Sequence, residues 1–200
     1  MKIVTILFFT AVSTCFGQSY SFDKLVKSEH RSNFLPDIEH TYLFNSKDYS
    51  YTMKIFSKND SLKSFLIDAK RNQVHYFNID KKDSLRLNHY KTENFKPKLP
   101  KYTYEFSDLE IKKNKKKILL TFRNEEKRKI AKYRLTIKET DQNFFPLFKL
   151  TGAVEPFQMM NIQAPLNFMV LKSKGINISR NPLVYILKSI DDINVLIKIP

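Results

Sequence analysis

The alternation of apolar and polar residues over residues 50–90 constrains this chain more than any other feature. Tyr51, Met53 and Ile55 fall on one side of an extended chain, and the same spacing returns in the segments that follow. Clusters of Asn, Asp and Ser interrupt the alternation every ten to twelve residues or so, as turns do between short strands. The stretch therefore predicts four antiparallel strands joined as a meander.

The rest of the chain carries the same signal with two ambiguous places. Residues 19–31 have apolar residues at helical spacing and are compatible with a short helix. Residues 189–193 are expected to turn a closing hairpin between strands at 183–187 and 194–199, and residues 109–111 to extend the strand before them. About eleven or twelve strands in one domain predict an all-β, mainly antiparallel fold. We expect a curved sheet or an incomplete up-and-down barrel, with at most one or two short helices.

The first 17 residues have the pattern of a secretory signal peptide. Lys2 precedes an apolar run of ten residues, and small residues lead to a cleavage site after Gly17. The expected product is one β-rich domain, residues 18–200, that is secreted or periplasmic and has no transmembrane segment. Lipid anchoring at Cys15 is the alternative. Because Cys15 is the only cysteine, cleavage after Gly17 would exclude disulfides and thiol chemistry.

Positive charge is the strongest compositional feature, with 35 Lys and Arg against 20 Asp and Glu and a net charge of +15. An acidic polymer such as lipopolysaccharide or polysaccharide is a candidate partner. The alternative is that these lysines and arginines form the solvated face of a sheet and bind no partner. Nucleic acid is disfavoured because no RRM, OB or KH motif accompanies the charge. The candidate polyanion-binding residues are Lys112, Lys113, Lys115, Lys116, Lys117, Lys127, Arg128 and Lys129.

The segment 144–169 is rich in Phe and Met and largely uncharged. Such side chains adapt to lipid or protein ligands, but they equally well form ordinary core that fills or covers the sheet. The candidate residues for an apolar ligand or a lid are Phe144, Phe145, Phe148, Phe157, Met159, Met160, Phe168 and Met169.

Catalytic signatures are weak. The histidines have no ligand-spaced partner, no nucleophile elbow occurs, and the three glycines form no phosphate loop. We therefore expect no metal and no cofactor, and an enzyme is only the third candidate.

In size, signal and strand density the chain is similar to the LolA-like group of periplasmic proteins, curved sheets that carry lipids or lipoproteins. The sequence reading favours a non-enzymatic envelope protein that binds an apolar or amphiphilic ligand in the concave face of a curved sheet. A surface or structural module that binds an acidic polymer or a protein partner through its basic face is the alternative.

Overall fold

The computed structural model describes residues 17–32, 38–58, 61–80, 86–97, 101–151 and 160–199. The predicted signal peptide, except for Gly17, lies outside the described residues. The same holds for Cys15, so its lipidation stays a prediction, as does cleavage after Gly17.

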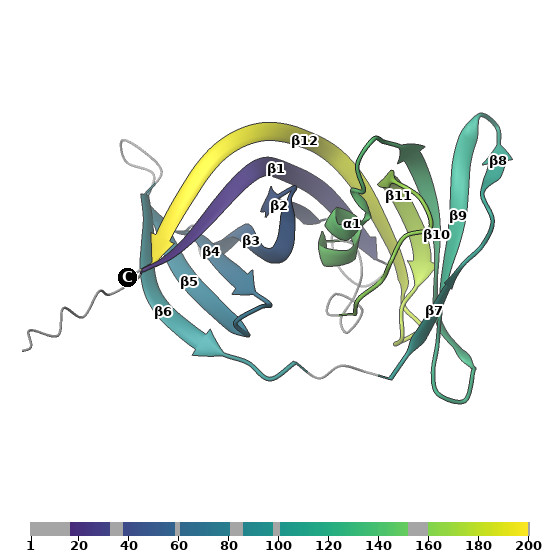
Figure 1. The fold of residues 1–200 in the computed structure, drawn as a ribbon, viewed down its shortest axis with the longest axis horizontal. Coiled ribbons are helices and arrows are strands. Elements are labelled where there is room, and N and C mark those ends of the chain that lie inside the picture. The colour runs from purple at the N-terminus through teal and green to yellow at the C-terminus, as the bar shows by residue number, and fades with distance from the viewer. Residues whose placement is uncertain are drawn as a thin grey trace, which may run out of the picture.

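Twelve strands and one short helix make up the described ranges (Figure 1). The first half contains β1 (Gln18–Ser32), β2 (Ile38–Asn45), β3 (Asp48–Lys58), β4 (Ser61–Asp68), β5 (Gln73–Asp80) and β6 (Arg86–Asn94). The second half contains β7 (Thr103–Phe106), β8 (Glu110–Lys112), β9 (Lys115–Arg123), β10 (Lys129–Glu139), α1 (Phe145–Thr151), β11 (Phe168–Ile176) and β12 (Pro182–Ile199).

All of these strands belong to one antiparallel sheet, in the order β6-β5-β4-β3-β2-β1-β12-β11-β10-β9-β7 with β8 paired to β9. The sheet is curved and, over the described ranges, is not closed into a barrel: there β6 pairs only with β5, and β7 only with β9. The predicted all-β, mainly antiparallel fold is confirmed, and so is the meander, which forms β3 to β6. In Figure 1, β1 and β12 arch over the molecule and α1 lies inside the arch.

The N-terminal segment corrects one expectation. The helical spacing at 19–31 does not produce a helix, because this stretch is the fifteen-residue strand β1. Its backbone pairs with β2 on one side and with β12 on the other. Pairing along both edges outweighs the weak local preference for a helix.

The C-terminal segment corrects a second expectation. No hairpin turns at 189–193, since β12 is one strand of eighteen residues. Twice along its pairing with β1, opposite Phe22/Lys24 and Lys27/Ser28, the register shifts because β12 contains one extra residue. Such β-bulges bend a strand without reversing it. Residues 110–112 likewise do not extend β7 but form the separate strand β8.

The second half of the sheet has a filled interior. Ile118, Leu120 and Phe122 of β9 and Tyr133 and Leu135 of β10 are buried in one cluster. The cluster also includes Phe145 and Phe148 of α1 and Phe168 of β11. Their rings meet edge to face or tilted, at centroid distances such as 5.6 Å between Phe145 and Phe168. The helix therefore closes this part of the concave face.

In the first half, both faces of the sheet contribute side chains to buried clusters. On one face, Leu43, Met53 and Leu66 pack with the start of β1 and the end of β12. On the other face, Tyr42 and Phe44 pack with Leu147 of α1. The face of β2–β4 that is turned towards α1 is called the inner face, and the candidate site lies between it and the helix.

Candidate functional site

A hollow of about 420 Å³ separates the inner face of β2–β4 from α1 and residues 160–161. Aromatic and aliphatic side chains form most of its wall, together with two lysines and several small polar groups. The described lining residues are Tyr42, Tyr49, Ser50, Tyr51, Thr52, Lys54, Phe65, Ile67, Ala69, Lys149, Leu150, Met160 and Asn161.

Strand register brings the sheet side of this wall together. Tyr42 on β2 is paired with Lys54 on β3, which is paired in turn with Phe65 on β4. Thr52 on β3 is paired in the same way with Ile67. Directly paired residues of neighbouring strands point to the same face, so these side chains form two adjacent rows.

Helix α1 supplies the opposite wall. Asn143 precedes the helix and accepts a hydrogen bond from the Phe145 N–H through Oδ1, at 2.9 Å, as an N-cap does. Leu147 is buried against Tyr42 and Phe44, which fixes the rotation of the helix. Lys149 and Leu150 then lie on the part of the helix that faces the hollow.

Two lysines give the hollow a positive character. Lys54 and Lys149 are partly buried, and burial lowers the pKa of each ammonium group. Lys149 Nζ donates to the Met160 carbonyl oxygen at 3.1 Å, and Lys54 Nζ lies 5.7 Å from the centre of the Tyr42 ring. Among the described residues that line the hollow, none is acidic.

A second hollow of about 450 Å³ shares Lys54 and Phe65 with the first. Its wall includes His40 and the exposed Glu39. The His40 ring meets that of His30 at 4.6 Å between centroids. Burial is the main cause that lowers the pKa of both histidines to about 4, and the charge of Lys54 adds to it, so both are neutral at pH 7.

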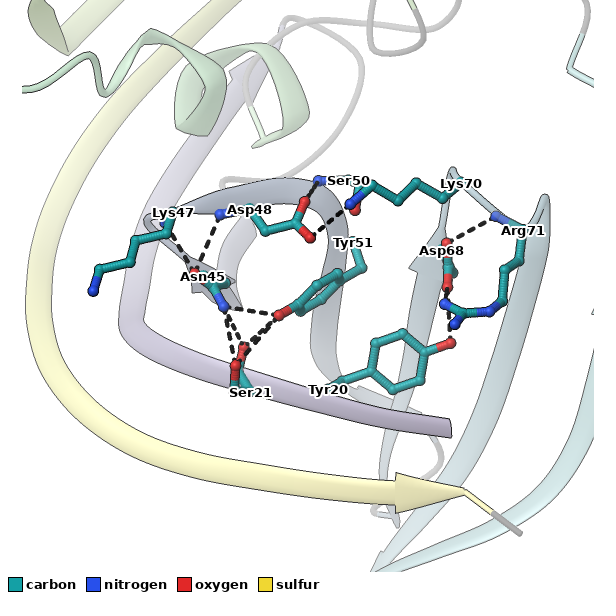
Figure 2. A network of polar contacts seen from close by, with 10 residues as sticks. All are labelled: Tyr20, Ser21, Asn45, Lys47, Asp48, Ser50, Tyr51, Asp68, Lys70 and Arg71. Atoms are coloured by element: carbon teal, nitrogen blue, oxygen red, sulfur yellow. Dashed lines mark hydrogen bonds and ion pairs between the residues drawn. The ribbon is translucent and has the colours of Figure 1, made fainter. Parts of the chain in front are cut away.

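A network of polar contacts holds the start of β3, where the first hollow begins (Figure 2). Asn45 Nδ2 donates to the Tyr51 hydroxyl at 2.8 Å, and that hydroxyl donates to the Ser21 carbonyl at 2.9 Å. Asp48 accepts from the Ser50 N–H at 3.0 Å and from Lys70 Nζ at 2.9 Å. The Asp48 carboxylate is therefore already paired at the edge of the hollow.

A buried network joins β1, β4 and β5 on the other side of the sheet. The Tyr20 hydroxyl lies 2.9 Å from Asp68 Oδ2 and 3.1 Å from His75 Nε2. Asp68, only 1% exposed, also accepts from the Arg71 N–H and guanidinium at 2.9 and 2.8 Å. Burial alone would raise the pKa of Asp68, but these donors outweigh it and lower the pKa. The network is packed into the core, and none of its residues lines either of these two hollows, so we interpret it as structural.

The described residues contain no group of three or more His, Cys, Asp and Glu side chains that could hold a metal ion. Within the same ranges, no helix has both the length and the apolar character needed to cross a bilayer.

The structure separates the candidate residues of the apolar tail. Met160 lines the first hollow. Phe145, Phe148 and Phe168 are at most 1% exposed in the filled core and are not part of the lining. Phe144 and Met169 are partly buried outside the hollow, and Phe157 and Met159 lie outside the described residues. Binding by this set stays a prediction.

The candidate polyanion-binding residues form two groups at opposite ends of β9. Lys112 to Lys117 surround the turn between β8 and β9, whereas Lys127 to Lys129 follow the turn towards β10. Lys115 and Lys116 line an open hollow of about 740 Å³ together with Lys138 and Lys172. An ion pair of 2.8 Å joins Lys116 to Glu139 there. Polyanion binding also stays a prediction.

Most residues of the first hollow, the inner hollow, were not predicted from the sequence, including Lys54, Lys149 and Leu150. Lys54 alternates with Met53 and Ile55, which assigns it to the wet face of a one-sided sheet. The sequence did contain one signal, because Phe65 and Ile67 both lie on one side of the next strand. It shows that both faces of this region carry large apolar side chains.

Comparison with known proteins does not assign a family. No protein-family model matches the chain, and no curated protein matches it. Among solved structures the chain is similar to PNGF-II, with 8% identity and a TM-score of 0.39. That alignment covers 87% of this chain but only 28% of PNGF-II.

Two further solved structures are similar over most of both chains. The LolA superfamily protein NE2245 from Nitrosomonas europaea shares 8% identity with a TM-score of 0.36, over 86% of this chain and 85% of that one. A putative outer membrane lipoprotein-sorting protein domain from Vibrio parahaemolyticus shares 7% identity with a TM-score of 0.26, also over 86% and 85%. Likeness at this level does not transfer a function.

Proposed function

We propose that the protein is a non-enzymatic, secreted or periplasmic envelope protein that binds an apolar or amphiphilic, lipid-like ligand between β2–β4 and α1. The observation that supports this is the first hollow itself. Its volume of about 420 Å³ lies within the range of roughly 300–1,000 Å³ that is usual for small-molecule sites. Such sites are mostly apolar with a few placed polar groups, as this one is.

The contrast with the second half of the sheet strengthens the proposal. There, α1 and the aromatic side chains around Phe145 and Phe168 fill the interior. Over β2–β4, Phe65 and Ile67 are partly exposed and face the hollow, and among the described residues no comparable aromatic cluster covers them. Apolar surface facing a hollow inside the molecule is where a ligand gains most from leaving water.

The test is binding of a fluorescent fatty acid, dansylaminoundecanoic acid, together with native mass spectrometry of the protein purified from its own host. We expect saturable binding and a co-purified lipid. Ile67→Asn should weaken binding by about tenfold or more, whereas Ile111→Asn, at an exposed position on β8, should not change it. Absence of both probe binding and co-purified lipid would remove the proposal.

A second candidate, binding of an acidic polymer, is favoured by the hollow that Lys115, Lys116, Lys138 and Lys172 share. Lysines from three strands converge there, which the sequence alone did not indicate. If they neutralise an anionic polymer, affinity for heparin should fall with salt. The Lys115→Ser/Lys116→Ser variant should then lower the slope of log K against log salt by about one unit per lost contact. An unchanged slope would identify these lysines as solvated surface.

A further inference from the structure

The proposed function does not say which charge the ligand carries, and two lysines of the inner hollow bear on that question. The hollow presents two ammonium groups, Lys54 from the floor and Lys149 from the helix, among mainly apolar walls. They come from segments 95 residues apart in the chain and meet only because α1 packs over β2 and β3. Two cations from opposite walls of one hollow are an arrangement that favours an anion between them.

Neither ammonium group has an acidic partner among the described residues. Lys149 donates to a carbonyl oxygen, and Lys54 is near the Tyr42 ring. Ion pairs engage other lysines of the same half, such as Lys24 with Asp192 and Lys70 with Asp48. Asp48, which directly precedes the lining residues Tyr49 and Ser50, already accepts from Lys70 and from the Ser50 N–H.

Burying an unpaired ammonium group costs free energy, because its hydration is lost without an opposite charge in return. The lowered pKa of both lysines reflects that cost, since burial is the cause in each case. His40, beside Lys54, remains neutral and supplies no counter-charge. An anionic group bound between the two lysines would offset the cost and would also accept their hydrogen bonds.

We propose that the hollow selects an amphiphile with a negatively charged headgroup, and that Lys54 and Lys149 bind that headgroup while Phe65, Ile67, Leu150 and Met160 contact the apolar chain. This inference rests on the proposed function and adds the class of ligand. A carboxylate and a phosphate monoester share the required chemistry, which is a compact anion with several acceptor oxygens.

The experiment compares dansylaminoundecanoic acid with its methyl ester, which keeps the chain and the fluorophore but removes the charge. The proteins are the parent, Lys54→Met, Lys149→Met and the double variant. Lys47→Met, an exposed lysine in the turn between β2 and β3, is the matched control. Methionine keeps most of the side-chain length and removes a buried charge, so these variants should fold at least as well as the parent.

The parent should bind the acid about 10- to 100-fold more tightly than the ester, as expected for hydrogen bonds to a charged group. The single variants should each lose part of this preference, the double variant should bind acid and ester equally, and the control should behave as the parent. Laurate and dodecyl phosphate should displace the probe, whereas the neutral dodecyl maltoside should not. Displacement by only one of the two anions would identify the headgroup.

Equal binding of acid and ester by the parent would overturn the inference and leave the proposed function intact. A preference that persists in the double variant would overturn it as well, because the charge would then be recognised elsewhere. If the parent binds neither compound, the proposed function fails and this inference fails with it.

Discussion

Both halves of the sheet alternate apolar and polar residues, but their two faces are covered differently. In β9–β11 one face is filled by α1 and its aromatic partners, and the other face carries lysines into water. In β2–β4 both faces are inside the molecule, and the inner one is only partly covered. The difference shows that alternation assigns residues to two faces but does not say which face meets solvent. Packing of distant segments decides that.

The largest loss of stability should come from removing a buried aromatic side chain in the filled half of the sheet. Phe148 contacts Tyr133, Phe145 and Tyr185 and is 1% exposed, so Phe148→Ala should cost about 3–5 kcal/mol of unfolding free energy. Phe65→Ala, in the partly open half, should cost about 1 kcal/mol and weaken ligand binding. Urea unfolding measures both. Equal costs for the two variants would mean that the halves are packed alike.

A middle-sized effect concerns the buried network at the end of β4, where Asp68 joins Tyr20 and Arg71. Asp68→Asn should destabilise the protein by about 1–3 kcal/mol at neutral pH, because charge-assisted hydrogen bonds are lost. The folded pKa of Asp68 is lowered, so its stabilisation is present above the unfolded pKa and disappears as pH falls through the folded value.

Urea midpoints measured from neutral pH down to about pH 3 test this sign. The parent should lose stability towards acid more steeply than Asp68→Asn, so the two curves should converge at low pH. Parallel curves over the whole range would show that the carboxylate contributes no charge-dependent stability.

The smallest effect is expected at the two lysines that begin β9. Lys115→Ser/Lys116→Ser should change the unfolding free energy by no more than about 0.5 kcal/mol, because exposed ion pairs such as Lys116–Glu139 contribute little. Fatty-acid binding should not change either, since both lysines lie away from the inner hollow. A large loss of probe binding in this variant would mean that the ligand binds outside the inner hollow.

Much of the fold was predictable because the alternation is local. Turn residues and period-two spacing were sufficient for β3 to β6, where each strand pairs with the next in sequence. The pattern was ambiguous at 19–31, and the prediction was wrong at 189–193, because β1 and β12 pair with each other across the whole chain. No local pattern encodes that pairing, nor does it distinguish a β-bulge from a turn.

The site was less predictable than the fold. The Phe- and Met-rich tail includes Met160, which lines the hollow, but Phe145 and Phe148 could not be distinguished from core before α1 was placed. Lys54 looked like any other strand lysine. Its position inside the molecule depends on α1, some ninety residues later, covering the face on which it lies.

Photolabelling with a diazirine fatty acid tests the central claim most directly, because it reports where the ligand lies. After cross-linking and proteolysis, the label should map to peptides that contain Phe65 and Ile67 of β4 and Leu150 or Met160, and excess laurate should suppress it. Label that is concentrated on Lys115, Lys116 or Leu171, around the hollow of about 740 Å³, would contradict a ligand site between β2–β4 and α1, and so would label that laurate does not suppress.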